Sequence, residues 1–341
     1  MAMIVRRRRV KNIELVDKRV ADKIKLWILR VILDFGGFRE FYDTRGFFSS
    51  DELAIFLGLE EFVENDFVDT DRKAIKQILN QELIRLEKEG KNSSLPILQK
   101  NIQRFAKLLS LGRVEQKIVE FVALMHHYDI LKEGVSLLGD NIDRTRLYKI
   151  LAILLDERVN DVKRALDFDA KLVSSSLIRI NPYPVNLPSL LELIDENFVD
   201  KLINFDADVS ELLKEWIDRT KDSELEIEDF SHIKEDVTNI LEYLQVVVGR
   251  GERGVNILFY GVPGTGKSEL SRVVAKELGL ELFEVSYTKE RGGFMDGASR
   301  LEAYKMAQAL FANRAMLLLY DEAEDIFDRG VKNKERQIYK A

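Results

Sequence analysis

One short glycine-rich segment constrains this chain more than any other feature of its sequence. Residues 254–279 read GVNILFYGVPGTGKSELSRVVAKELG, with an apolar run at 255–260 before the loop and an amphipathic stretch after it. The residues that match the pattern G-x-x-x-x-G-K-[ST] are Gly261, Gly264, Gly266, Lys267 and Ser268. This order predicts a β-strand over 255–260, a phosphate-binding loop, and a helix that ends at Gly279.

The loop has the chemistry of a polyphosphate site. Several backbone N–H groups must point at one polyphosphate, which requires backbone angles that glycine tolerates best. The loop also leads into the N-terminus of a helix, which favours an anion. We expect Lys267 to bridge the β- and γ-phosphates and the Ser268 hydroxyl to ligate Mg²⁺. A plain glycine turn would explain the glycines but not these two side chains together. The residues predicted to bind nucleotide are Gly261, Val262, Pro263, Gly264, Thr265, Gly266, Lys267, Ser268 and Glu269.

A second apolar run ends in two carboxylates. Residues 315–322 read AMLLLYDE, which predicts a buried parallel strand with acids at its carboxyl end. Ligand chemistry in open α/β sheets lies at that edge. We expect Asp321 to hold Mg²⁺ through water and to orient Ser268, and Glu322 to polarise the attacking water.

With both motifs in place, residues 230–327 resemble the first half of an AAA-type ATPase core, with Walker A at 261–268 and Walker B at 317–322. The resemblance implies an α/β P-loop NTPase fold with a partial parallel sheet, ATP and Mg²⁺ as ligands, and Lys267 and Glu322 as catalytic residues. It also implies a homo-oligomeric ring in the complete protein and a protein partner to be remodelled. By the same resemblance, residues 229–233 lie where the family contacts adenine, with Ile233 where many members have glycine.

The sequence departs from the family pattern in two places. The segment 287–297 occupies the position of the family's pore loop, but Phe294 and Met295 stand one residue further from the glycine. The sequence also stops about twenty residues after Walker B. Strands at 255–260, 281–286 and 315–320 are therefore predicted to form, with the first and third lacking the neighbour that should lie between them. We expect a truncated product, a fragment or one piece of a split protein, with weak hydrolysis.

The rest of the chain predicts a mainly α-helical domain over 1–220, an acidic linker at 221–229 and an incomplete ATP-binding domain at 230–341. Ser49 and Glu52 form a predicted capping box for a short helix that runs to residue 57. One strand is expected at 177–180, and the segment 144–180 faintly suggests a winged helix. The other predicted helices are 13–33, 71–89, 95–110, 113–126, 143–155, 158–167, 188–203 and 209–218.

Composition excludes several classes of protein. The chain has 46% hydrophobic and 33% charged residues, which is typical of a globular protein and not of a disordered one. It has no cysteine, which excludes a disulfide scaffold and thiolate metal sites. No apolar run approaches the roughly 20 residues that span a bilayer, and the N-terminus lacks the apolar stretch of a secretory signal. We expect a cytoplasmic protein that does not contact a membrane.

Three functions remain open from the sequence. The first is an ATPase that couples Mg-ATP hydrolysis to the remodelling of a protein partner. The second is a nucleotide-dependent nucleic-acid-binding module, since residues 1–30 carry ten Lys and Arg against three acidic residues. The third is a catalytically weak nucleotide-binding scaffold. The adjacent His126 and His127 diverge by about 100° on a helix, so they are not expected to share a metal.

Overall fold

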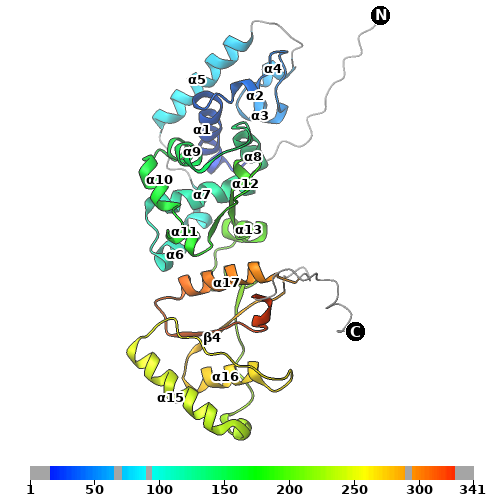
Figure 1. Ribbon diagram of the computed structural model, residues 1–341. Helices are drawn as coiled ribbons and strands as arrows, with labels where there is room; N and C mark the ends of the chain where they lie inside the picture. The colour runs from blue at the N-terminus through cyan, green and yellow to red at the C-terminus, as the bar shows by residue number, and fades with distance from the viewer. Residues whose placement is uncertain (1–15, 65–70, 90–93, 289–293, 327–341) are drawn as a thin grey trace, which may run out of the picture. The chain divides into compact units, whose positions relative to one another are not determined.

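Two units with separate cores make up the chain in a computed structural model that describes residues 16–64, 71–89, 94–288 and 294–326 (Figure 1). The division falls between residues 206 and 207. The first unit is helical with one short hairpin, and the second holds a three-stranded sheet between helices. No helix among the described residues is both long and apolar enough to cross a bilayer.

The core of the first unit forms around α1 and α7. The helix α1 buries Trp27 against Phe121 of α7, with the two rings edge to face at 5.1 Å. Arg30 also enters this core, where it donates to two backbone carbonyls and to Glu87. The helices of this unit are α1 (Lys18–Asp34), α2 (Phe38–Phe41), α3 (Asp51–Phe56), α4 (Glu60–Glu64), α5 (Asp71–Glu89), α6 (Pro96–Leu109), α7 (Arg113–His127), α8 (Asp129–Ser136), α9 (Arg144–Leu155), α10 (Val159–Ala165), α11 (Lys171–Ser174), α12 (Leu187–Leu190) and α13 (Glu196–Asn204).

The prediction of one helix over 188–203 is wrong. The structure has α12, then the strand β2 (Leu191–Leu193), then α13. The strand β2 pairs antiparallel with β1 (Ile178–Ile180), so tertiary pairing overrides local helical periodicity. Asp195 then starts a new helix by accepting from the Phe198 N–H at 2.7 Å.

The predicted capping box is wrong by one residue. The N-cap of α3 is Ser50, not Ser49, and its hydroxyl accepts from the Leu53 N–H at 3.2 Å. Asp17 caps α1 in the same way through the Arg19 N–H, so that helix begins at Lys18. The first residues of the predicted helix, 13–15, lie outside the described residues.

The second unit is built on a mixed sheet in the order β3-β4-β5. The strands β4 and β5 are parallel, with Glu281 opposite Met316, and β3 is antiparallel to β4, with Ile217 opposite Val285. In Figure 1, α16 and α17 lie on opposite sides of β4. The elements of this unit are α14 (Val209–Leu212), β3 (Ile217–Arg219), the 3-10 helix η1 (Ile227–Ile233), α15 (Lys234–Arg250), α16 (Lys267–Glu277), β4 (Glu281–Val285), α17 (Gly297–Leu310), β5 (Met316–Leu319) and the 3-10 helix η2 (Ala323–Ile326).

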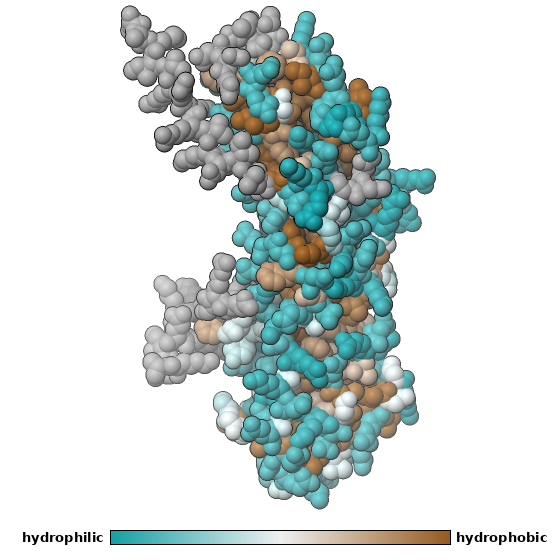
Figure 2. Space-filling model, turned by 180° about the vertical axis from the view of Figure 1, so that it is seen from behind, coloured by the Kyte–Doolittle hydropathy of each residue, from teal (hydrophilic) through white to brown (hydrophobic). Residues whose placement is uncertain are grey.

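The predicted strand at 255–260 does not form. This segment pairs with no strand among the described residues, and Leu258 and Tyr260 are 75% and 88% exposed. The predicted strand at 315–320 does form, as β5, but its residues are half-buried and not buried. A strand needs hydrogen-bonding neighbours, and the segment 255–260 has none among the described residues. Figure 2 shows brown, hydrophobic patches on a face of the protein that is otherwise mostly hydrophilic.

The structure divides the chain earlier than the predicted boundary at 220. Strand β3 lies before that boundary, yet it pairs with β4 of the second unit. The predicted linker 221–229 also packs on this unit, where the Ser223 hydroxyl donates to Glu269 at 2.9 Å and is almost fully buried. We therefore propose that residues 207–229 belong to the second unit.

Candidate functional site

The glycine-rich loop has the backbone that its sequence requires. Gly264 and Gly266 have φ angles of 80° and 82°, in the left-handed region that side chains with a Cβ rarely adopt. Gly266 is also the N-cap of α16, so the loop delivers its chain directly to a helix N-terminus. A hydrogen bond within the loop stabilises it, because the Thr265 hydroxyl donates to the Val262 carbonyl at 3.0 Å. This end of α16 therefore has the N–H groups that lack an acceptor within the helix, which suits a phosphate.

Lys267 lies over the loop that precedes it. Its ammonium group donates to the carbonyl of Gly261 at 3.1 Å and to that of Val262 at 2.9 Å. These contacts hold the positive charge beside the same turn as the helix amides. A polyphosphate seated on the loop would meet a helix dipole and a full positive charge together.

The glycine-rich loop and the acidic end of β5 lie next to each other in the fold. Ser268 Oγ donates to Asp321 Oδ2 at 2.7 Å, although the two residues lie far apart in the sequence. Asp321 follows β5 directly, and Ser268 lies in the first turn of α16, so the sheet edge and the helix end place them together. The sequence predicted that Asp321 orients this hydroxyl, and the structure has that hydrogen bond.

Hydroxyl and carboxylate oxygens are the donors that Mg²⁺ prefers, and in nucleotide sites the ion takes few protein ligands because phosphates and water complete its shell. Ser268 and Asp321 fit that pattern. The described residues contain no group of three or more His, Cys, Asp or Glu side chains that could hold a metal by themselves.

Glu322 follows Asp321 at the end of the same strand. Its side chain is exposed, and its backbone has a φ of 50°, an unusual angle for a residue with a Cβ. Asp321 Oδ1 accepts from the Glu322 N–H at 2.9 Å and so stabilises this turn. Glu322 is therefore an exposed residue that directly follows the Asp321 of the hydroxyl–carboxylate pair.

Sequence reasoning missed the groups that surround these residues. Arg300 of α17 is fully buried and donates to the carbonyls of Asp321 and Glu322. Burial raises the pKa of the Glu284 carboxyl, which the Asp321 charge raises further and the Arg272 charge lowers. No motif spacing in the sequence identifies Arg300 or Glu284. Both residues come near the acidic turn only when the sheet and its helices have packed together.

Glu269, predicted to bind nucleotide, directs its carboxylate to protein groups. It accepts from the Ser223 hydroxyl and pairs with Arg272 one turn later in α16. Its backbone stays in the first turn of the helix, so an amide contact to phosphate remains its predicted role.

The segment predicted to contact adenine folds as η1. Phe230 is buried there, and its ring lies 3.5 Å from where a Cβ on Gly266 would stand, so this segment contacts the loop. His232 stacks on that ring at 6.4 Å, and Ile233 ends the element.

The predicted pore-loop region is only partly described, because residues 289–293 lie outside the described residues. On either side of them, Thr288 and Phe294 form an isolated antiparallel bridge. Phe294 is 80% exposed, whereas Met295 is buried.

His126 and His127 contact different groups: His126 Nε2 lies 2.7 Å from the Leu191 carbonyl oxygen, and His127 packs against Tyr128.

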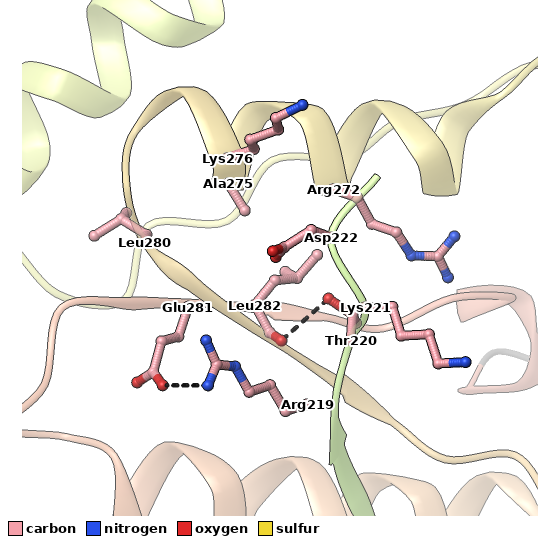
Figure 3. A pocket seen from close by; sticks show the side chains of 10 residues that line it. All are labelled: Arg219, Thr220, Lys221, Asp222, Arg272, Ala275, Lys276, Leu280, Glu281 and Leu282. Atoms are coloured by element: carbon pink, nitrogen blue, oxygen red, sulfur yellow. Dashed lines mark hydrogen bonds and ion pairs between the residues drawn. The ribbon is translucent and has the colours of Figure 1, made fainter. Parts of the chain in front are cut away.

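A small cavity lies at the other end of α16 (Figure 3). Its volume is about 20 Å³, which is too small for a nucleotide. An ion pair between Arg219 and Glu281 and a hydrogen bond from Thr220 to Leu282 close it. The cavity marks where β3 joins the sheet and is separate from the loop.

A family model and a known protein each match part of this chain. Residues 257–340 match the model of the family described as ATPase family associated with various cellular activities (AAA). The Holliday junction branch migration complex subunit RuvB of Oleidesulfovibrio alaskensis is 38% identical over 56 residues, which are 16% of this chain. The chain thus spans about 17% of the length of that relative. No solved structure matches significantly. The chain contains an AAA-type ATPase region, and the helical unit is not identified by these comparisons.

Proposed function

We propose that this AAA-type ATPase region binds Mg-ATP on residues 261–268 and hydrolyses it. The observation that carries the proposal is the 2.7 Å hydrogen bond between Ser268 and Asp321. It joins the loop to the acidic strand end, as a site for a metal-bound triphosphate requires.

Each residue has a role that its place supports. The amides at the start of α16 and the Lys267 ammonium group hold the phosphates and neutralise charge that develops during transfer. Ser268 and Asp321 would hold the Mg²⁺ that binds together with ATP. Glu322 takes the proton of the attacking water, and its exposed carboxylate is available for this. When bound, ATP would supply the phosphoryl group, and Mg²⁺ would polarise it.

Two substitutions test the proposal. Lys267→Ala removes the charged contact to the phosphates and should weaken ATP binding at least about tenfold, measured by calorimetry. Glu322→Gln should leave binding intact and lower any single-turnover hydrolysis by about 10² to 10⁴. Lys276→Ala is the matched control, because this lysine lies in the same helix and pairs with Glu226, away from the loop. Unchanged affinity in Lys267→Ala would overturn the site.

We further propose that the ATPase region acts in an oligomer, as a ring in its complete form, and remodels a protein partner in the cytoplasm. The family match supports this proposal. Light scattering of Glu322→Gln with Mg-ATP tests it, because a variant that binds without turnover should accumulate the assembled state. A monomer under saturating Mg-ATP would contradict assembly by this chain. The nucleic-acid alternative depends on the basic segment 1–30, of which residues 1–15 lie outside the described residues.

A further inference from the structure

Arg300 is the one large charged side chain of the second unit that the structure buries completely among its described residues. It lies in the first turn of α17, on the face of the sheet opposite α16. A buried guanidinium loses its hydration, so it persists only where polar partners replace water. The partners of Arg300 therefore indicate what it does.

Two of those partners are backbone carbonyls of the acidic turn. One terminal nitrogen donates to the Asp321 carbonyl at 2.5 Å, and the other donates to the Glu322 carbonyl at 3.4 Å. The guanidinium carbon lies 4.3 Å from the centre of the Tyr320 ring. Arg300 thus contacts three consecutive residues at the end of β5, with its planar fork on two carbonyls and its face on a ring.

These contacts meet the turn where it is strained. Glu322 has a left-handed backbone, and the carbonyls on both sides of that residue's N–Cα–C unit accept from Arg300. On the opposite side of the turn, Asp321 Oδ1 accepts from the Glu322 N–H, while Oδ2 accepts from Ser268. The backbone of the turn is therefore hydrogen-bonded by the Arg300 guanidinium on one side and by the Asp321 carboxylate on the other.

We infer that Arg300 is a positioning residue that holds Asp321 against Ser268 and so makes nucleotide binding dependent on Mg²⁺. This inference rests on the proposed function. Arg300 contacts backbone on the far side of the turn, so it acts through Asp321 and Glu322. Its loss should affect the metal-dependent part of binding and leave the loop's own contacts to the phosphates in place.

The test measures ATP affinity with Mg²⁺ and with EDTA for wild type and Arg300→Met. The ratio of the two dissociation constants reports the metal-dependent part. We expect Arg300→Met to keep the EDTA affinity within about twofold, because Lys267 and the α16 amides are unchanged. The Mg²⁺-dependent ratio should fall toward one. Arg314→Met is the matched control, since Arg314 follows α17, is exposed and pairs with Glu281.

A second variant separates positioning from folding. Arg300→Lys keeps the charge but can reach only one of the two carbonyls, so its ratio should lie between wild type and Arg300→Met. If Arg300→Met does not fold by circular dichroism, Arg300→Lys with a wild-type ratio overturns the inference. A wild-type ratio in folded Arg300→Met overturns it too, and the proposed function then stands. A wild-type chain that binds no nucleotide overturns both.

Discussion

Glu322 combines an exposed carboxylate with a left-handed backbone. Other described residues with a Cβ share that conformation, and two of them, Ser110 and Asp156, simply end helices, where such an angle is common. Glu322 follows a strand, and strain of about 1–3 kcal/mol at such a position persists only when the surroundings hold it. The hydrogen bonds of Asp321 and Arg300 supply that hold. The left-handed backbone of Glu322 therefore belongs to the candidate site and does not mark the end of a helix.

Glu133 of α8 is a half-buried carboxylate whose stability effect depends on pH. Burial raises its pKa, the nearby charges of Glu52 and Asp129 raise it further, and a hydrogen bond with Ser50 lowers it. Because the folded pKa exceeds the unfolded one, this group favours folding below the unfolded pKa of about 4.3, and that contribution is lost as pH rises through the folded pKa.

Glu133→Gln should therefore raise the melting temperature at pH 7 relative to wild type, because it removes a charge that is poorly solvated. The difference should disappear near pH 3, where Glu133 is protonated in both the folded and the unfolded chain. Thermal unfolding at the two pH values measures this. An equal shift at both would show that packing, and not the charge, is responsible.

Short elements of this chain depend on single caps and on pairing. The helix α3 is six residues long, and its first turn depends on the Ser50 hydroxyl, which also contacts Glu133. A helix this short has little stability of its own, so a cap contributes a large share.

Ser50→Ala should cost about 1 kcal/mol of unfolding free energy, since it leaves the Leu53 N–H without its acceptor. Ser49→Ala is the matched control, because this exposed serine is the residue that sequence patterning favoured as the cap. Urea unfolding of both variants measures the difference. A larger loss in Ser49→Ala would place the cap where the sequence suggested.

Pairing explains why the two predicted strands beside the site differ. The strand β5 forms because β4 offers a parallel partner over four residue pairs. The segment 255–260 has a similar apolar composition but pairs with no described strand, and most of its side chains are exposed. Composition alone does not distinguish these cases, because a strand is a property of two segments.

Two units with separate cores should unfold separately. Calorimetry of the whole chain should show two transitions, and Mg-ATP should raise only the transition of the unit after residue 206. At one hundred times the dissociation constant, the stabilisation is about 2.7 kcal/mol. Lys267→Ala should abolish the shift without changing the other transition. A single transition that moves as a whole would contradict independent units.

The amino-acid sequence by itself determined the chemistry of the loop and the acids. Gly264 and Gly266 have the positive φ angles that the loop motif requires. Lys267 and Ser268 follow that loop, and Asp321 and Glu322 follow an apolar strand, so the sequence predicts that these side chains lie at the same edge of the sheet. Long amphipathic helices such as α5 were also predictable, because their periodicity is local. Only the tertiary structure decided that β2 replaces a helix, that β3 joins the sheet, and that Arg300 lies beneath the acidic turn. These depend on contacts between distant segments, and no local pattern records which segment a backbone will pair with or which carbonyls a buried guanidinium will reach.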